Sequence, residues 1–466
     1  MRASFVISAA SECQNMTGKG TNVETVVDSS LSDSSAKVPL LASGLLALLA
    51  ATATNLPKGP GLACALMLLV ALVHARHWKC CSARKTLPLA GLLLLAGLSG
   101  LSHLLIDGWH ALDTPLRYLL ALPVVFWLSR IRLQPGVLFA GFVVGALVAG
   151  LTALYQLLVV PESLVSAHRA DGLVGKVFTF GTLVSVQAAA CVCAAVYFYR
   201  RGNNMACAAS VAGVALGITG CVLSGNRGSW VALAPALLLL FLLFGKSLGA
   251  RQVLGLMLSG VLVLGLAWTS VPFVKQRTEA ALRELTVYSV ADGVQHEDCV
   301  SYYGSVGIRL ELWRAALREF QKSPLIGLSF KERSRFDQQL KNEGYCFDFH
   351  EKTDGTGSAH SEFFDALAKR GLLGVIAIFL LYLIPARHFV RCWRQCVSHA
   401  DKAVPAVGLA MVTVYAFAGL TERFLFAHAE AMFYAFMVTG LWFMSSQVCD
   451  KPAGQKSGEL SREQAL

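Results

Sequence analysis

The amino-acid sequence predicts an all-α, polytopic membrane protein. Hydrophobic residues make up 55% of the 466 residues and charged residues only 15%, whereas a soluble domain has about 25% charged residues. The apolar residues also come in runs close to the ~20 residues that cross a bilayer as a helix. One long polar stretch, residues 273–370, interrupts these runs. Together these observations predict transmembrane helices with one large extramembrane loop that contains amphipathic helices.

Twelve apolar segments predict about twelve transmembrane helices. Helices 1–9 are expected within residues 38–272 and helices 10–12 within residues 371–446. Residues 1–37 are rich in Ser, Thr, Asn and Asp and are expected to form a disordered tail, since their apolar patch is short for a cleaved signal peptide, which is the alternative. Residues 447–466 form the other tail. The segments lie near 38–55, 60–75, 87–105, 116–129, 136–160, 176–199, 205–223, 229–244, 252–272, 371–386, 403–420 and 427–446.

The charges of the short loops predict the orientation in the membrane. Most Lys and Arg residues lie in one set of alternating loops, and basic residues favour the cytoplasmic side. Both termini are therefore expected in the cytoplasm and the stretch 273–370 on the outer side. The larger set is Arg76, Lys79, Arg84, Lys85, Arg130, Arg132, Arg200, Arg201, Lys246, Arg251, Arg387, Arg391, Arg394 and Lys402, and the smaller set is Lys58, Arg117, Arg169, Lys176, Arg227 and Arg423.

The outer stretch contains an amphipathic helix. Apolar residues recur at helical spacing from Ile308 to Phe320, with charged residues on the other face, and Ser323-Pro324 predicts its end. An apolar face of this kind can rest on lipid headgroups. That interpretation does not explain why Arg309 stands at the start of the helix.

Two cysteines, Cys299 and Cys346, lie in the outer stretch. On an oxidising side of the membrane they are a candidate disulfide. Two unpaired thiols are the alternative, because the sequence does not show whether they come within bonding distance. Most of the other cysteines lie in apolar runs or in loops expected in the cytoplasm, where they are expected to be small buried hydrophobes.

Three outer arginines are candidates for binding an anion. Arg227 lies in the tight turn Ser224-Gly-Asn-Arg-Gly-Ser-Trp230, Arg309 begins the amphipathic helix, and Arg169 precedes the sixth apolar segment. A guanidinium suits phosphate because it presents a planar fork of donors and stays charged. The alternative for each is an interfacial arginine paired with a lipid phosphate or a carboxylate.

His360 is the candidate general base. It stands where the polar stretch enters an apolar helix through Gly371-Leu-Leu-Gly374. An imidazole titrates near pH ~6.5 and can accept a proton from a hydroxyl at neutral pH. A structural role is the alternative for any one of the 11 histidines of the chain.

The sequence contains no motif for several other functions. The net charge of +11 is distributed over short loops, where it contacts anionic headgroups, and no basic stripe interleaved with aromatics predicts a nucleic-acid partner. Walker-type, Asp-x-Asp, Gly-x-Ser-x-Gly and His-Glu-x-x-His motifs are missing from the sequence, so no metal site is predicted. The polar residues between 348 and 354 lack a ligand spacing and read as a solvated loop.

The blocks around the arginines and His360 resemble the O-antigen ligase and polymerase superfamily of bacterial envelopes. The resemblance covers roughly residues 130–445 and favours a ligase over a polymerase. The matching blocks are His360-Ser361 followed by nine residues and Gly371-Leu-Leu-Gly374, similar to the ligase signature; Gly225-Asn-Arg-Gly228, similar to the outer-facing arginine motif; and Arg309-x-x-x-Trp313 to Pro324-x-x-Gly327, similar to the periplasmic helix.

The resemblance implies a glycosyltransferase of the bacterial inner membrane that acts on the periplasmic face and needs no cofactor. Its donor would be a glycan on undecaprenyl diphosphate, held by Arg227 and Arg309 with Arg169 as a third candidate. Its acceptor would be a sugar hydroxyl of the lipid A–core oligosaccharide, deprotonated by His360 for an inverting displacement. The alternatives are an O-antigen polymerase, a protein O-oligosaccharyltransferase and, outside enzymes, a secondary transporter.

Overall fold

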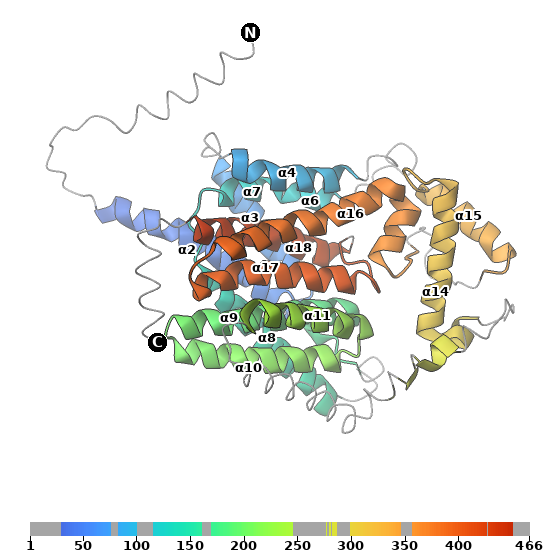
Figure 1. Cartoon of the computed structure of the whole chain (residues 1–466), viewed down its shortest axis with the longest axis horizontal. Coiled ribbons are helices and arrows are strands. Elements are labelled where there is room, and N and C mark those ends of the chain that lie inside the picture. The colour runs from blue at the N-terminus through green and yellow to red at the C-terminus, as the bar shows by residue number, and fades with distance from the viewer. Residues whose placement is uncertain are drawn as a thin grey trace, which may run out of the picture. The chain divides into compact units, whose positions relative to one another are not determined.

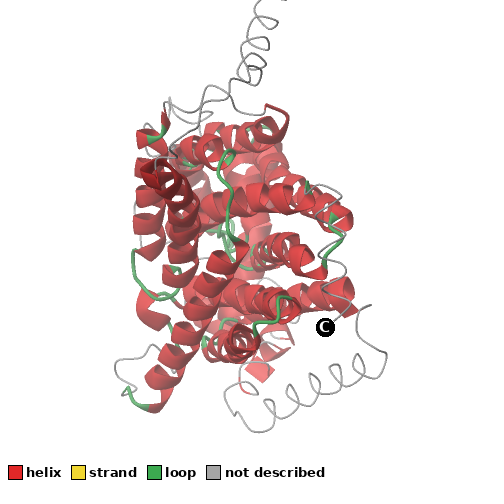
Figure 2. Cartoon of the chain, turned by 90° about the vertical axis from the view of Figure 1, so that its left-hand side faces the viewer, coloured by secondary structure: helices red, strands yellow, loops and turns green. Residues whose placement is uncertain are grey.

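The computed structural model describes residues 29–75, 83–99, 115–160, 169–245, 299–345, 357–425 and 427–450, with short pieces between 276 and 286. The chain divides into an N-terminal unit, Met1–Val38, and one large unit, Pro39–Leu466, and the arrangement given below is that of the large unit. The described residues form helices and connecting turns without a strand (Figure 2). The all-α prediction is therefore confirmed for this part of the chain.

The described helices correspond closely to the predicted apolar segments, apart from η6, α14 and α15, which lie outside them. In chain order they are α2 (Ser29–Thr52), α3 (Gly59–Val73), α4 (Ala83–Leu98), α6 (Leu116–Leu120), α7 (Leu122–Leu128), α8 (Pro135–Leu158), the short η6 (Gly172–Val174), α9 (Val177–Arg200), α10 (Asn204–Leu223), α11 (Arg227–Phe244), α14 (Cys299–Lys322), α15 (Phe330–Asn342), α16 (Glu362–Gln395), α17 (His399–Ala418) and α18 (His428–Cys449).

Seven of these helices are long and apolar enough to cross a membrane, judged by length and composition: α8, α9, α10, α11, α16, α17 and α18. Shorter apolar helices cover residues 37–52, 59–73, 86–98 and 116–128. Each predicted span thus coincides with an apolar helix except the one near 252–272, which lies outside the described residues. A total of twelve spans stays a prediction.

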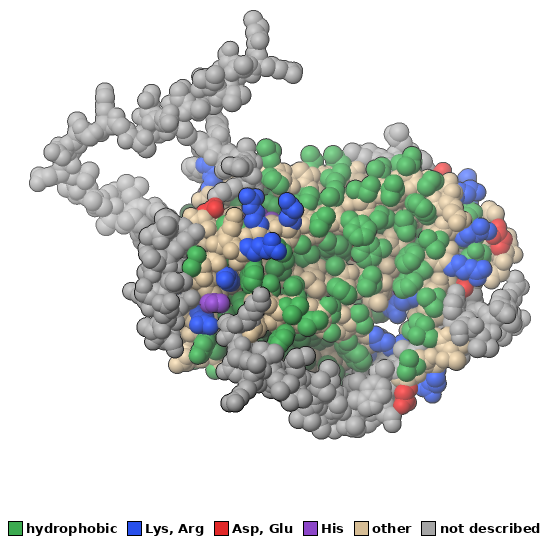
Figure 3. All heavy atoms as spheres, in the orientation of Figure 1, with side chains coloured by type: hydrophobic (Ala, Val, Ile, Leu, Met, Phe, Trp, Pro, Cys, Tyr) green, Lys and Arg blue, Asp and Glu red, His purple; other side chains and the backbone are tan. Residues whose placement is uncertain are grey.

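The flank of the helices carries an apolar band. Large side chains stay exposed along the long helices, for example Leu151 (57%), Leu242 (62%) and Leu383 (63%). Figure 3 shows this band between two ends at which Lys and Arg side chains gather. Contiguous exposed apolar surface of this extent is rare on soluble monomers, and the band is typical of a surface that faces lipid.

The centre of the large unit consists of α17 and α18. Figure 1 shows them between α8–α11 on one side and α3, α4, α6 and α7 on the other. Buried tyrosines stabilise this centre, because Tyr434 donates its hydroxyl to the Leu381 carbonyl at 2.6 Å and Tyr415 donates to the Glu430 carbonyl at 2.9 Å. In an apolar interior such polar groups need internal partners.

Small residues let the long helices approach closely. A Cβ on Gly141 of α8 would lie 2.4 Å from the Ala47 carbonyl oxygen of α2, and one on Gly217 of α10 would lie 2.9 Å from the Ala188 Cβ of α9. The sequence places these glycines in Gly-x-x-x-Gly spacings, at Gly141 and Gly145 and at Gly213 and Gly217. The packing role is the one expected of such spacings in lipid.

The helix predicted in the outer stretch is confirmed as α14. Its backbone is interrupted at Gly304, and it ends at Lys322, directly before Ser323-Pro324. Figure 1 shows α14 crossing the ends of the long helices. Its apolar face contacts protein: Leu312 and Ala315 pack with Leu340 of α15, and Ala316 packs with residues at the start of α16. Protein contacts therefore bury Leu312, Ala315 and Ala316, while Leu317 stays 44% exposed.

The end of α14 is interlocked with a kink in α16. Gly371 interrupts the helical backbone of α16 with φ 58°, and Gly327 has φ 72°. A Cβ on Gly371 would lie 2.5 Å from the Leu325 carbonyl carbon, and one on Gly327 would lie 2.3 Å from the Arg370 nitrogen. The Leu372 N–H donates to the Pro324 carbonyl at 2.8 Å and the Leu328 N–H to the Ala368 carbonyl at 2.9 Å. The close approach explains why both segments carry glycine.

Candidate active site

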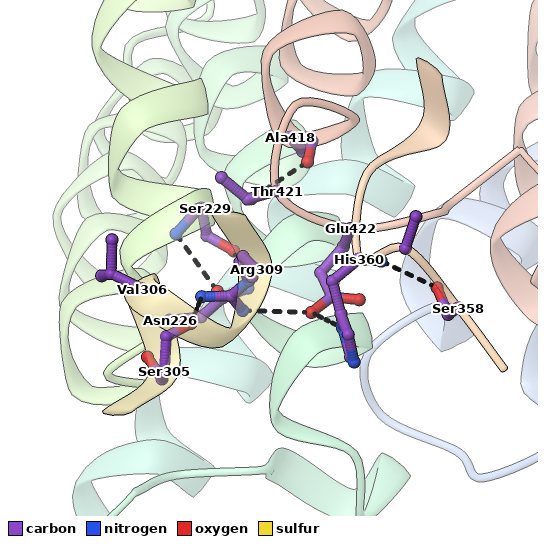
Figure 4. A network of polar contacts seen from close by, with 12 residues as sticks. Asn226, Ser229, Ser305, Val306, Arg309, Ser358, His360, Ala418, Thr421 and Glu422 are labelled. Atoms are coloured by element: carbon purple, nitrogen blue, oxygen red, sulfur yellow. Dashed lines mark hydrogen bonds and ion pairs between the residues drawn. The ribbon is translucent and has the colours of Figure 1, made fainter. Parts of the chain in front are cut away.

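Four segments that are distant in the sequence meet at one end of the long helices. They are the turn between α10 and α11, the part of α14 that follows its interruption at Gly304, the residues that lead into α16, and the turn between α17 and α18. Figure 4 shows Asn226, Arg309, His360 and Glu422, one residue from each segment, around a common polar network. Two of the residues expected from the sequence, Arg309 and His360, are thereby brought together.

Glu422 links the two. The His360 Nδ1 lies 2.9 Å from the Glu422 Oε1, and the Arg309 Nη2 lies 3.3 Å from the same oxygen. The side chains of Arg309 and Glu422 are 19% and 11% exposed, while His360 is 42% exposed. The carboxylate and the guanidinium are therefore mostly withdrawn from solvent, and the imidazole remains accessible.

Sequence reasoning missed Glu422. It stands in Thr421-Glu-Arg423, a short turn between two apolar segments, next to Arg423, which belongs to the smaller set of basic loop residues. A single carboxylate in a turn has no periodicity or motif of its own. The available signal was its position, because an acidic residue at the end of two spans needs a partner.

The backbone at His360 is strained and fixed from several sides. Its φ is 45°, a left-handed value that non-glycine residues rarely adopt. The His360 N–H donates to the Ser358 Oγ at 3.1 Å, and the Trp313 Nε1 donates to the Ala359 carbonyl at 3.0 Å. The Ala359 N–H in turn donates to Asp365 Oδ1 at 3.2 Å. Such strain costs of order 1–3 kcal/mol and persists where surrounding contacts over-determine the conformation.

Arg227 is the first residue of α11. Asn226 caps the helix by accepting the Gly228 N–H at 3.2 Å, which sets the turn. The Arg227 Nη1 lies 3.4 Å from Glu284 Oε2, and the same carboxylate oxygen accepts the Val306 N–H at 2.8 Å. Arg227 is therefore connected through Glu284 to the part of α14 just after its interruption at Gly304, close in sequence to Arg309.

Both arginines keep an unused donor. The Nε atoms of Arg227 and Arg309 are buried and have no hydrogen-bond partner among the described residues. Buried donors are normally satisfied, and a guanidinium binds phosphate with Nε and Nη together. The arrangement suits an anionic ligand that would complete these bonds.

Arg169 stands behind the Arg227 turn. Its Nε donates to the Ser224 carbonyl at 3.1 Å and its Nη2 to the Gly225 carbonyl at 3.4 Å. The guanidinium also lies 5.5 Å from the centre of the Phe178 ring. These contacts support the turn that presents Arg227. The predicted contact of Arg169 with phosphate stays a prediction.

A second group of charged side chains lies between α14 and α15. The Arg333 Nε is 2.8 Å from Glu319 Oε2, and its Nη1 donates to the Gly357 carbonyl at 2.6 Å. Burial raises the pKa of the neighbouring Asp337 to about 8, against the lowering effect of Arg333. This group fixes the segment that leads to His360.

The two cysteines of the expected disulfide fall at or beyond the margin of the described residues. Cys346 lies outside them, and at Cys299 only the helical backbone is described. The disulfide between them therefore stays a prediction. Among the residues that the structure describes, no group of three or more His, Cys, Asp or Glu side chains is arranged to hold a metal ion.

The fold and site define a helical membrane protein with a histidine, a carboxylate and cationic donors at one end of its spans. Comparison with known proteins gives a family. A family model described as O-antigen ligase matches residues 212–379, a segment that contains Arg227, Arg309 and His360. This segment of the chain therefore matches the O-antigen ligase family, and the resemblance of these blocks to the family is confirmed.

A relative from Haemophilus influenzae, described as an uncharacterized protein, is 23% identical over 341 residues. The alignment covers 70% of this chain and 78% of the relative. The match extends well beyond the family segment, and the relative's description names no activity.

Proposed function

We propose that the protein is an O-antigen ligase. It transfers a glycan from undecaprenyl diphosphate to a sugar hydroxyl of lipid A–core oligosaccharide, at the periplasmic face of the bacterial inner membrane. The observation that carries the proposal is the contact of His360 and Arg309 with one Glu422 oxygen, at 2.9 and 3.3 Å. It supports the proposal because the candidate base and the candidate phosphate-binding group lie side by side, and both residues stand within the segment 212–379 that matches the family model.

The contact with Glu422 defines how His360 acts. A carboxylate accepts a hydrogen bond from the Nδ1–H of a neutral imidazole, so the lone pair stays on Nε2. In the transfer, Nε2 takes the proton of the acceptor hydroxyl while the oxygen of that hydroxyl attacks the anomeric carbon of the donor glycan. The bond from that carbon to the diphosphate oxygen breaks, and undecaprenyl diphosphate leaves with the bonding electrons. A single displacement of this kind inverts the anomeric carbon.

The arginines stabilise the leaving group. Charge develops on the diphosphate oxygen as the bond breaks, and fixed donors at that position lower the barrier. Arg227 and Arg309 would supply these donors through their unused Nε atoms. Each charge-assisted contact contributes about 1.5–3 kcal/mol. No metal is required in this account, and turnover in the presence of EDTA is expected to be unchanged. Activity that is lost in EDTA and restored by Mg²⁺ would contradict it.

The apolar band supports a lipid-linked donor. A polyprenyl chain in the bilayer can reach a site at the end of the spans only from the side, past the exposed apolar flank (Figure 3). The candidate groups stand at helix ends, with Arg227 at the first position of α11, whereas transporter sites lie near the membrane midplane. This location favours the enzyme over the secondary transporter.

Reconstitution with defined substrates tests the proposal. Purified protein in lipid is given an undecaprenyl-diphosphate glycan and, in separate reactions, lipid A–core, a second lipid-linked glycan or an acceptor protein. Transfer to lipid A–core is the expected result. Transfer to the second glycan would make the protein a polymerase, and transfer to protein an oligosaccharyltransferase. Undecaprenyl-diphosphate glycan moved across the bilayer without transfer would make it a transporter.

A further inference from the structure

Ser361 and Glu362, which directly follow His360, hold the turn between α17 and α18. The Glu362 N–H donates to the Gly419 carbonyl at 2.7 Å, and the Ser361 Oγ donates to the same carbonyl at 3.3 Å. The Leu425 N–H donates back to Glu362 Oε2 at 2.8 Å. The two ends of the turn are thereby tied to two consecutive residues of the His360 segment.

The chemistry of these bonds is unusual for a helix start. Ser361 is the N-cap of α16, yet its side chain makes no capping bond to that helix, although serine is favoured at this position because it caps. Its hydroxyl instead satisfies the carbonyl of Gly419, which is the C-cap of α17 and belongs to the carbonyls that a helix end leaves unpaired. Ser361 is 1% exposed and Glu362 is fully buried.

The same turn is confined from the opposite side. A Cβ on Gly228, next to Arg227, would lie 2.0 Å from the Thr421 Oγ1. A Cβ on Gly419 would lie 3.2 Å from the Glu362 Cβ. The turn that carries Glu422 therefore lies between the arginine motif and the histidine motif, with little room to shift.

We infer that Ser361 and Glu362 are positioning residues that hold the turn 419–425 so that Glu422 meets His360 and Arg309. The inference rests on the proposed function, because it assigns them a role in the same transfer. This role differs from a general contribution to stability, because loss of the clamp should lower turnover only by displacing Glu422. Displacement by about 1 Å can lower a rate on the order of 100-fold, and a clamp of three hydrogen bonds is the device that prevents it.

A double-mutant comparison in the reconstituted transfer assay tests this inference. Glu362→Ala is expected to lower kcat about 100-fold in the wild-type background and to have little further effect in a Glu422→Ala background. Glu362→Gln keeps an oxygen that accepts the Leu425 N–H and is expected to retain near wild-type turnover. Glu362→Ala and Ser361→Ala each remove one bond of the clamp, because the Glu362 N–H to the Gly419 carbonyl belongs to the backbone. Ser361→Ala gives the same comparison should the Glu362→Ala protein fail to fold.

The matched control is Ser185→Ala. Ser185 is a buried serine whose hydroxyl donates to the Gly181 carbonyl of its own helix at 2.7 Å, and its loss is expected to leave kcat unchanged. An equal loss from Glu362→Ala, or from Ser361→Ala in its place, in both backgrounds would overturn the clamp and leave the proposed function standing. Full turnover in Glu422→Ala itself would instead overturn the proposed arrangement of the site.

Discussion

The Arg333–Glu319 pair and the Arg309–Glu422 pair both involve α14, and they differ in length, in burial and in the contacts that they share. Arg333 and Glu319 are 2.8 Å apart with side chains 3% and 0% exposed. Arg309 and Glu422 are 3.3 Å apart and 19% and 11% exposed, and Glu422 also contacts His360. The first pair is short and closed by the Gly357 carbonyl. The second is longer and shared. Among the described residues each pair leaves one buried atom without a hydrogen-bond partner, which is the donor Nε of Arg309 in the second pair and the acceptor Oε1 of Glu319 in the first.

The difference separates a structural pair from a pair that is open to a ligand. The Arg333–Glu319 pair is almost fully buried, and its one atom without a partner among the described residues, Glu319 Oε1, is an acceptor that does not bind an anion. This pair can hold its segments together, and its loss should be felt in stability. A partly exposed pair with an unused donor can exchange its partner for a diphosphate. Changes in the two pairs should therefore be felt in different measurements, stability for one and turnover for the other.

The largest effect is expected at the open site. His360→Ala removes the proposed base and should lower kcat by about 10²–10⁴-fold, the range for general base catalysis, while the melting temperature of the purified protein changes little because His360 is partly exposed. Turnover of lipid-linked donor is the measurement. Near-normal kcat in this variant would remove His360 from the chemistry.

At the closed pair the expected loss is in stability. Arg333→Leu leaves Glu319 buried without its partner and should cost about 3–5 kcal/mol, measured by thermal or denaturant unfolding. The double variant Arg333→Leu with Glu319→Leu is the control, because removal of both charges should recover most of the loss. An Arg333→Leu protein as stable as the wild type would show that the pair does not hold α14 and α15 together.

Conservative changes of the arginines should have an intermediate effect. Arg309→Lys and Arg227→Lys keep the charge but lose the planar fork, so kcat should fall about 10–100-fold, the equivalent of one charge-assisted bond of about 1.5–3 kcal/mol. Arg335→Lys, an exposed position on α15, is the control and should be neutral. Full activity in both site variants would reduce the arginines to point charges.

A further effect concerns pH and the closed region. Since burial raises the pKa of Asp337 to about 8 from 3.8, the folded protein holds a proton between these values that the unfolded chain releases. The contribution of Asp337 to stability therefore decreases as pH rises from 4 to 8. Asp337→Asn, which cannot titrate, should flatten this part of the profile of melting temperature against pH. An unchanged slope would contradict the raised pKa.

The sequence is sufficient for the elements whose signals are local. Apolar runs predict the long helices, periodicity from Ile308 to Phe320 predicts α14, and Ser323-Pro324 predicts its end. Arg309 and His360 could be selected because each stands at an unusual place relative to a span. The structure adds that they meet, which no local pattern contains.

The remaining parts of the site depend on tertiary contacts. Glu422 is far from His360 in the sequence, and Glu284 reaches Arg227 from a segment without a motif. The position of Ser361 before a helix predicts a capping role, whereas in the structure its hydroxyl donates to the Gly419 carbonyl. Such partners are chosen by packing between helices, so a single sequence indicates at most that a polar group there needs a partner.

The most direct test of the account is one isosteric change in each pair. Glu422→Gln and Glu319→Gln remove one negative charge each, and both kcat and melting temperature are measured on the two proteins. The account predicts that Glu422→Gln lowers kcat on the order of 100-fold or more with little change in melting temperature, and that Glu319→Gln lowers the melting temperature with kcat of the folded protein preserved. The reverse pattern would contradict the assignment of the open pair to catalysis.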